Sequence, residues 1–347
     1  MTFKLTSRYL LERRGLKLGH VSAPKAVDMP DKKTIMKAWK NDQSIVLPKL
    51  LDEQLPRYQA DIQRAHQCME STLNGVELGE QLEKNSSIKR LEPEFSFLAS
   101  SMEEHDEQAI EKLYFDAGDE QNILAEDLWC KASWLSFHDE DASLRFRFSF
   151  GMEGYEDVAA DPKRQHWAGE LCTKMFPESE LITKNTDILQ YMSSILGHQP
   201  AFVERIVYFN TPNGGAQFHH DVERGHAGVV FAQLSGATFW LAANKLQLMQ
   251  VMRDFSEKHN TPAELQSLLK NQVALSDYME EEDHGWVESL IDHNPIFIQY
   301  MIKQGYAHVL QTGDVLLLPQ RDLNHCVWHS VFTLGDEPGE ALSFAVR

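Results

Sequence analysis

The first third of the chain has the hydrophobic spacing of amphipathic helices. From about residue 30 to 115, apolar residues recur at intervals of three and four among charged residues, most clearly in segments 31–40 and 54–73. That spacing places the apolar side chains on one face of a helix. The pattern predicts a mainly helical N-terminal region over residues 1–140, and this region is a candidate homodimer interface.

The spacing changes to a two-residue alternation near residue 144. Between residues 144 and 150, leucine and phenylalanine alternate with arginine and serine, which is typical of a half-buried strand. Further strand-like runs lie at 202–209, 229–234, 237–243, 306–310, 315–318, 326–334 and 341–346. Glycine-rich turns, such as the one at 213–215, separate several of them. Many short strands joined by tight turns predict a barrel or sandwich.

Helical segments interrupt this β region. Residues 188–196 have helical spacing and precede Gly197, a residue that commonly ends helices. Residues 245–303 form a predicted helical insertion between two strands. Within it, Thr261 and Glu264 have the spacing of a capping box, with Pro262 at the first helical position. The predicted fold class is α+β, with a β domain at 141–347 that carries the insertion.

The charge balance narrows the classes of partner. The chain of 347 residues has 33 lysine and arginine residues against 52 aspartate and glutamate residues, a formal net charge of −19. A surface this acidic repels phosphate backbones and anionic lipids, so we expect no nucleic-acid and no membrane partner. No apolar run approaches the roughly 18 residues of a membrane span. Four cysteines without C-x-x-C spacing favour a reducing, cytoplasmic environment.

Residues 1–20 are a local exception to the acidic composition, because basic residues outnumber acidic ones there. We expect this segment to lie on the acidic body as a solvated arm. A targeting segment or a nucleic-acid-binding arm is the alternative.

The candidate chemistry lies just after the glycine turn. On an extended strand, residues two apart point to the same face, so His219 and Asp221 project together while His220 points away. An imidazole and a carboxylate so placed are two ligands of the facial triad that holds Fe(II). The third ligand would be His325 or His329, which lie four residues apart on one predicted strand, and the sequence leaves both open. Two imidazoles and a carboxylate also suit Zn, Mn, Co or Ni.

In this setting residues 208–346 resemble the JmjC-like and cupin-like branch of the Fe(II)- and 2-oxoglutarate-dependent oxygenases. The similar segments are 208–212 (YFNTP), the H-x-D motif, 233–240 (QLSGATFW) and 313–319 (GDVLLLP). The resemblance implies a double-stranded β-helix, that is, a jelly-roll or cupin-like barrel. It also implies Fe(II) as cofactor, 2-oxoglutarate and O2 as co-substrates, and hydroxylation of a protein side chain or a small molecule.

The residues available to anchor 2-oxoglutarate differ from the family pattern. Thr238 stands where the family has a lysine that binds the far carboxylate, and Arg347 is the one arginine after the late histidines. A desolvated dicarboxylate needs a cation or several hydrogen-bond donors. The predicted cofactor-binding residues are Thr238, Gln217, Asn210 and Arg347, and Lys245, Arg224 and Arg205 are further candidate cations.

Two other functions remain open at this point. A metal-binding cupin enzyme that does not use 2-oxoglutarate is favoured by Thr238 and by the missing family arginine. The third candidate is a non-catalytic protein that uses the barrel to hold a ligand or partner. The sequence does not identify the substrate.

Overall fold

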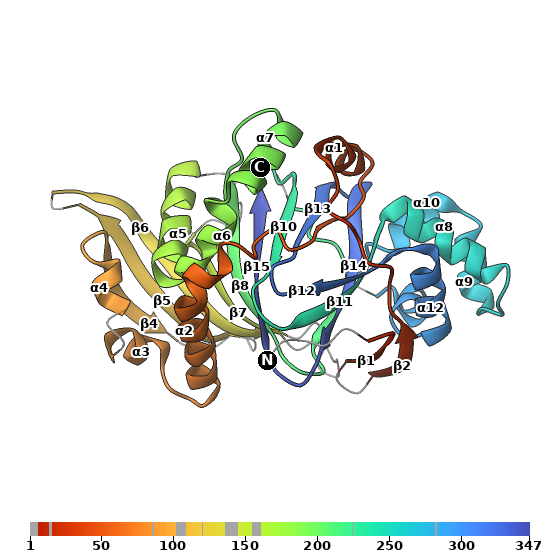
Figure 1. The fold of residues 1–347 in the computed structure, drawn as a ribbon, viewed down its shortest axis with the longest axis horizontal. Helices are drawn as coiled ribbons and strands as arrows, with labels where there is room; N and C mark the ends of the chain where they lie inside the picture. The colour runs from red at the N-terminus through yellow and green to blue at the C-terminus, as the bar shows by residue number, and fades with distance from the viewer. Residues whose placement is uncertain are drawn as a thin grey trace.

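The fold is a mixed α/β arrangement built around a large antiparallel sheet (Figure 1). The computed structural model describes residues 6–13, 16–84, 87–101, 109–119, 121–135, 145–154, 161–223, 225–281 and 283–347. Along the sheet the strand order is β12-β11-β14-β13-β10-β15-β8-β7-β6-β5-β4, with β3 on β13 and β9 on β14. This arrangement is consistent with a jelly-roll-like fold.

The strands predicted after residue 200 are confirmed to within a few residues. They are β8 (Phe202–Asn210), β10 (Gly228–Gln233), β11 (Ala237–Asn244), β12 (Ala307–Gln311), β13 (Val315–Asp322), β14 (His325–Leu334) and β15 (Gly339–Val346). The structure adds the short strand β9 (Gly215–His219), which ends at the first residue of the H-x-D motif. Nearly all residues of β10, β13 and β15 are buried, so both faces of these strands are covered. This agrees with their mostly apolar sequences. The packed rows include Val230, Leu317 and Phe344.

The N-terminal helices form where the apolar spacing predicts them. They are α1 (Lys32–Lys40), α2 (Leu55–Leu73), α3 (Leu78–Lys84) and α4 (Ser87–Leu91), with the short strand β3 (Ile45–Leu47) between the first two. Asp31 caps α1 by accepting a hydrogen bond from the Thr34 amide at 2.7 Å.

The prediction of a mainly helical region over 1–140 is wrong beyond about residue 95. Strands β4 (Phe95–Ser101), β5 (Ala109–Gly118) and β6 (Ile123–Leu135) extend the sheet and continue into β7 (Arg145–Met152), which pairs with β8. Buried residues in β5 alternate, as at Leu113, Phe115 and Ala117. Aromatic residues between them, such as Tyr114, obscured this two-residue period. The predicted boundary at 140/141 lies outside the described residues.

Helices α5 (Pro162–Met175), α6 (Glu180–Thr183) and α7 (Thr186–Leu196), with the short 3-10 turn η1 (Pro177–Ser179), connect β7 to β8. α5 packs on β6, β7 and β8 (Figure 1). Gly197 ends α7 in the left-handed conformation at φ 80°, as the sequence predicts.

The predicted insertion is helical. It contains α8 (Lys245–Ser256), α9 (Ala263–Leu269), α10 (Gln272–Tyr278), α11 (Gly285–Ile291) and α12 (Pro295–Gln304), which cluster at the end of the molecule beyond β11 and β14 (Figure 1). α9 begins as predicted, but the capping box does not form, because the Thr261 hydroxyl bonds to Ser256 instead. None of the described helices is both long and apolar enough to cross a bilayer.

The basic N-terminal segment is not a solvated arm, and this prediction is wrong. Strands β1 (Arg8–Arg13) and β2 (Leu16–Ser22) pair antiparallel, and β1 contacts β14 while β2 contacts α12. Tyr9, Leu11 and Leu18 are buried, and Arg13 is fully buried. The alternating apolar residues of β1 and β2 therefore anchor this segment in the core, despite its basic charge.

A pair of buried carboxyls links η1 to the end of β15. Glu178 and Glu340 are both fully buried. Burial raises the pKa of Glu178 to about 7. Burial and the nearby Glu178 carboxyl raise the pKa of Glu340 well above its ordinary value. The fold therefore favours the protonated pair.

This pair should make stability fall with rising pH. The neutral carboxyl of Glu178 stabilises the fold below its ordinary pKa of 4.5, and that stability is lost as the pH rises through about 7. The loss amounts to about 3 kcal/mol for Glu178, measured as the free energy of unfolding in urea from pH 4.5 to 8. The double variant Glu178→Gln/Glu340→Gln should reduce the fall by at least this amount, and the raised pKa of Glu204 should account for part of what remains. Glu180→Gln, with a carboxyl whose pKa is lowered, should keep it. An unchanged slope in the double variant would contradict the assignment.

Candidate metal centre

Pairing of β9 with β14 brings the two ends of the predicted triad together. His219 lies opposite His329 in the register of the two strands, and their ring centroids are 4.3 Å apart. β9 approaches β14 closely at Gly215, where φ is 142° and a Cβ would lie 2.0 Å from the Val331 carbonyl oxygen. A residue with a side chain would therefore force the strands apart just before the motif.

Asp221 completes the cluster from the loop after β9. Its Oδ1 lies 3.6 Å from His219 Nε2, and its Oδ2 lies 3.5 Å from His329 Nε2. One potential ligand atom from each of the three residues lies within 4.8 Å of the others. Ligands at about 2.1 Å from a metal, in adjacent positions, stand about 3 Å apart. The donor set and its spacing therefore fit one metal ion after a small contraction.

Backbone carbonyls orient both imidazoles. His219 Nδ1 lies 2.8 Å from the Gln217 carbonyl oxygen, and His329 Nδ1 lies 3.3 Å from that of Val327. A proton on each Nδ1 would donate to these carbonyls, which leaves both Nε2 atoms free of protons on the side of Asp221. Trp240 stacks on the His329 ring at 5.3 Å between centroids. The imidazoles are thus held in the tautomer that ligation requires.

The structure brings His329, and not His325, to the cluster. The His329 side chain is 3% exposed, whereas that of His325 is 52% exposed and its Nδ1 lies 2.9 Å from Asp322. The two histidines do share a strand, but four residues of strand span about 13 Å. The sequence predicts that both side chains point to the same face of the strand. Which of them lies opposite His219 depends on the register of β14 on β9.

Two adjoining cavities meet at the potential ligands: all three ligands line the inner cavity, and His219 and Asp221 also line the outer one. The inner cavity has a volume of about 20 Å³ and is lined by Tyr208, Asn210, Phe231, Trp240, Leu318, Val331 and Ser343 together with the triad. The outer one has a volume of about 330 Å³ and is lined in part by Glu204, Glu223 and Arg147. Burial and the neighbouring Glu223 raise the pKa of Glu204 to about 8. Four residues, including Tyr208 and Ser343, line both cavities, so the cluster is reached from the outer cavity.

Comparisons with known proteins find oxygenases among solved structures. No family model and no curated protein matches the sequence. An oxidoreductase of the 2OG-Fe(II) oxygenase family from Burkholderia pseudomallei matches over 93% of this chain and 92% of its own, at 7% identity and a TM-score of 0.36. AviO1 from Streptomyces viridochromogenes matches over 92% and 96%, at 10% identity and a TM-score of 0.38.

The ribosomal oxygenase YcfD from Escherichia coli is also similar, at 11% identity and a TM-score of 0.31. The match covers 94% of this chain and 53% of YcfD, so the chain spans about half of that protein's length.

The sequence predicts four residues that would bind 2-oxoglutarate, and one of them, Asn210, lines the inner cavity. Thr238 is fully buried, and its hydroxyl donates to Gln233 and accepts from Trp240. Gln217 donates to Glu288 at 3.0 Å. The hydroxyl proton of Thr238 is therefore already used within the core, and one amide N–H of Gln217 is committed to Glu288.

The candidate cations lie elsewhere. Arg347 and Arg205 line a separate cavity of about 320 Å³ beside α5. Lys245, 2% exposed, pairs with Glu280 at 2.5 Å. Arg224 lies outside the described residues. No lysine or arginine is among the residues that line the inner cavity in the described part of the chain.

Sequence reasoning missed the residue that supports the loop between the two ligands. His220 points away from the triad, as expected, and its Nε2 lies 2.9 Å from Glu280, which also binds Lys245. Glu280 lies in an acidic stretch of the insertion, and its side chain is 23% exposed. The partners of Glu280 are His220 and Lys245, which lie 60 and 35 residues before it in the sequence. No sequence pattern indicates that the insertion folds back onto the H-x-D motif, so this contact could not be predicted.

Proposed function

We propose that the protein is an Fe(II)- and 2-oxoglutarate-dependent oxygenase, with a double-stranded β-helix that holds iron through His219, Asp221 and His329. The single observation that carries this proposal is the convergence of three side chains: His219 and His329 face each other on two paired strands, and Asp221 reaches both Nε2 atoms from the loop after β9. The bound Fe(II) would supply O2 activation coupled to oxidation of the co-substrate.

The protein side chains would bind and orient the reactants. His219, Asp221 and His329 would hold the ion, and Tyr208, Asn210 and Ser343 offer hydrogen-bonding groups on the same inner wall for the co-substrate. Phe231 and Trp240 make the rest of the wall apolar and limit water. The substrate would enter through the outer cavity, so the reaction class is hydroxylation of a protein side chain or small molecule that fits there.

A metal-dependent cupin enzyme without 2-oxoglutarate is the second candidate. It is favoured by one observation: the described residues that line the inner cavity include no cation to pair with the far carboxylate of 2-oxoglutarate. In the favoured function, neutral donors such as Asn210 would bind that carboxylate.

Turnover of 2-oxoglutarate separates the candidates. We expect the iron-loaded protein to convert 2-oxoglutarate to succinate in the presence of O2, followed by NMR, and the Asn210→Ala variant to raise the KM for 2-oxoglutarate. The iron-free protein and the His329→Gln variant are the controls and should give no succinate. Iron binding without binding or turnover of 2-oxoglutarate would overturn the proposal in favour of the second candidate. A protein that binds no metal would be a non-catalytic ligand-binding barrel.

A further inference from the structure

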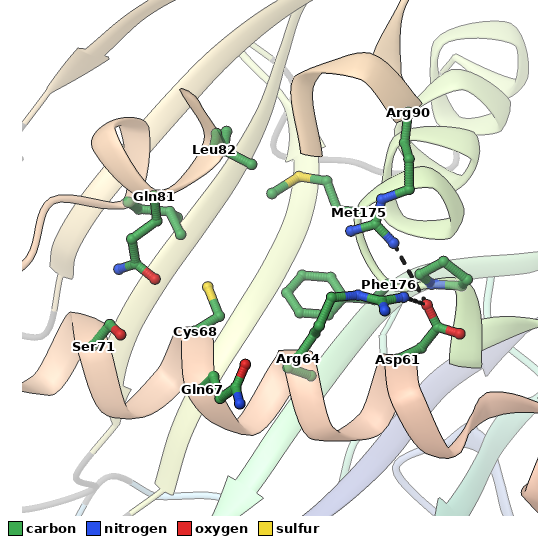
Figure 2. Close-up of a pocket in the computed structure, with 13 residues that line it drawn as sticks. Asp61, Arg64, Gln67, Cys68, Ser71, Gln81, Leu82, Arg90, Met175 and Phe176 are labelled. Atoms are coloured by element: carbon green, nitrogen blue, oxygen red, sulfur yellow. Dashed lines mark hydrogen bonds and ion pairs between the residues drawn. The ribbon is translucent and has the colours of Figure 1, made fainter. Parts of the chain in front are cut away.

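Two cavities that lie apart from the metal centre are lined by arginines. In the first, of about 410 Å³ beside α2, Arg64 and Arg90 both pair with the carboxylate of Asp61 (Figure 2). The second, of about 320 Å³, lies beside α5 and the start of β8, and Arg205 and Arg347 line it. Neither of these two arginines takes part in an ion pair among the described residues. The second cavity, here called the α5 cavity, shares no residue with the cavities at the triad.

The guanidinium of Arg205 is held in place against α5. Its Nη1 donates to the Gly169 carbonyl oxygen at 2.6 Å and to Thr173 Oγ1 at 2.8 Å. Its Cζ lies 5.8 Å from the centre of the Phe344 ring. A Cβ at position 169 would lie 2.7 Å from Arg205 Cζ, so a glycine in the middle of the helix makes room for the guanidinium. A guanidinium fixed in this way loses little freedom when it binds an anion.

The Nη2 group of Arg205 is left for a further acceptor. It has no hydrogen-bond partner among the described residues, and unlike Nε it is not buried out of contact with the cavity. Burial lowers the pKa of Arg205, and the Cys172 thiol and the Glu170 carboxylate oppose that shift. Glu170 is the one acidic side chain among the described residues that line the cavity, and it forms no ion pair with Arg205. The charge of the guanidinium is therefore only partly compensated.

A second group without a partner, the amide of Gln165, lies one helical turn before Gly169. Gln165 is 4% exposed, lines the cavity and makes no side-chain hydrogen bond within the described part of the chain. Its Oε1 is fully buried, whereas its Nε2 is not. Residues four apart lie on one face of a helix, about 6 Å apart along its axis. The amide N–H groups of Gln165 and the Nη2 of Arg205 are therefore neighbouring donors, and a ligand oxygen would satisfy both.

The rest of the wall is partly apolar. Leu189 of α7, Pro200 just before β8 and Phe202 within β8 line it. The volume of the cavity falls at the lower end of the range for small-molecule sites, about 300–1,000 Å³. The cavity therefore has room for a small organic group beside an anion.

We propose that the α5 cavity binds a small phosphate monoester, with the phosphate at Arg205 Nη2 and Gln165 Nε2 and the organic group against Leu189 and Phe202. A phosphate group has three acceptor oxygens, so it can accept from Arg205, Gln165 and Arg347 together, whereas a carboxylate has two oxygens. Two arginines against one glutamate also favour a ligand with more than one negative charge. The site is separate from the triad and does not depend on the oxygenase proposal.

Calorimetric titration of the full chain with phenyl phosphate tests the proposal. We expect saturable binding, weakened about tenfold or more by Arg205→Gln and severalfold by Gln165→Leu. Leucine removes a buried amide that has no partner among the described residues, so Gln165→Leu should be at least as stable as the parent. Lys163→Gln on the same helix is the matched control and should bind as the parent does, because Lys163 is exposed and does not line the cavity.

Gly169→Ala tests the position of the guanidinium without removing its charge. The added methyl group would displace Arg205, so this variant should also bind phenyl phosphate more weakly, by about tenfold. Alanine favours the helix, so a loss of binding cannot be assigned to a weaker α5.

The absence of saturable binding would overturn the proposal, as would binding that survives both Arg205→Gln and Gln165→Leu. Benzoate should bind more weakly than phenyl phosphate, and equal affinities would overturn the assignment of a phosphate group. The His329→Gln variant should bind phenyl phosphate as the parent does, and a loss there would place the ligand at the triad and contradict the proposal.

Thermal unfolding shows whether each variant is folded. If Arg205→Gln is unfolded, Gly169→Ala replaces it, and undiminished binding by that variant counts against the proposal. Succinate formation by the parent protein is measured separately, so failure at the α5 cavity and failure at the triad are distinguishable.

Discussion

Replacing His329 with glutamine should reduce Fe(II) affinity by more than about 100-fold and abolish succinate formation. Changes in groups that merely support a ligand cost 10–100-fold, and loss of the ligand itself costs more. The glutamine fills much of the volume of the imidazole beneath Trp240, so the loss reflects the missing ligand more than a collapsed core. Anaerobic titration with Fe(II), and with Co(II) as a spectroscopic probe, measures the affinity.

His325→Gln is the matched control on the same strand. Its side chain is 52% exposed and pairs with Asp322, so the variant should bind metal and turn over 2-oxoglutarate like the parent protein. If His325→Gln lost iron and His329→Gln kept it, the ligand set proposed for the centre would be wrong.

Replacing Arg13 with alanine should destabilise the protein by about 3–5 kcal/mol, because it leaves a buried carboxylate without its partner. Arg13 Nη2 lies 2.9 Å from Asp292 Oδ1, and both side chains are at most 1% exposed. Arg13 also donates to the Ala216 carbonyl oxygen and, at 2.9 Å, to Ser330 Oγ. Asp292 accepts from the Phe218 amide at 3.0 Å. Urea denaturation at neutral pH gives the free energy of unfolding.

The same contacts lie next to the proposed ligands. Ser330 follows His329 and Phe218 precedes His219, so folded molecules of Arg13→Ala should also bind Fe(II) more weakly. Arg8→Ala in the same strand is the control, because Arg8 is exposed, and should change stability by no more than about 0.5 kcal/mol. The double variant Arg13→Met/Asp292→Leu should recover part of the lost stability, since it leaves no buried charge. A loss below about 1 kcal/mol for Arg13→Ala would contradict this account.

The sequence predicts the elements that have one dominant period. Strands β8 to β15, apart from β9, and helices α1, α2 and α7 lie where their patterns place them. The region from β4 to β6 was misassigned because its exposed face carries large aromatic residues, such as Tyr114 and Trp129, which conceal the alternation. Each of these strands pairs with the next strand in the sequence, so the concealed alternation, and not a distant partner, accounts for the wrong prediction.

The candidate site was predictable in composition and only partly in geometry. The H-x-D spacing predicts that His219 and Asp221 project together, and the structure brings them together, although β9 ends at His219 and Asp221 lies in the loop after it. Choosing between His325 and His329 requires the register of β14 on β9, which depends on contacts more than a hundred residues apart along the chain. The burial of Arg13 was not predicted, because a basic segment is expected to be exposed to solvent. Arg13 is buried because it pairs with Asp292, which lies 279 residues away along the chain.

The distance along the chain between Arg13 and its partners has a consequence for how the centre assembles. Arg13 bonds to Ser330 across 317 positions, and the facing histidines belong to strands paired at long range. Contacts between residues so far apart along the chain form slowly, because the loop between them must first be closed at a cost in entropy. Recovery of iron affinity after dilution from denaturant should therefore report completion of the whole topology, and a fragment lacking either β1 and β2 or β14 should not acquire it.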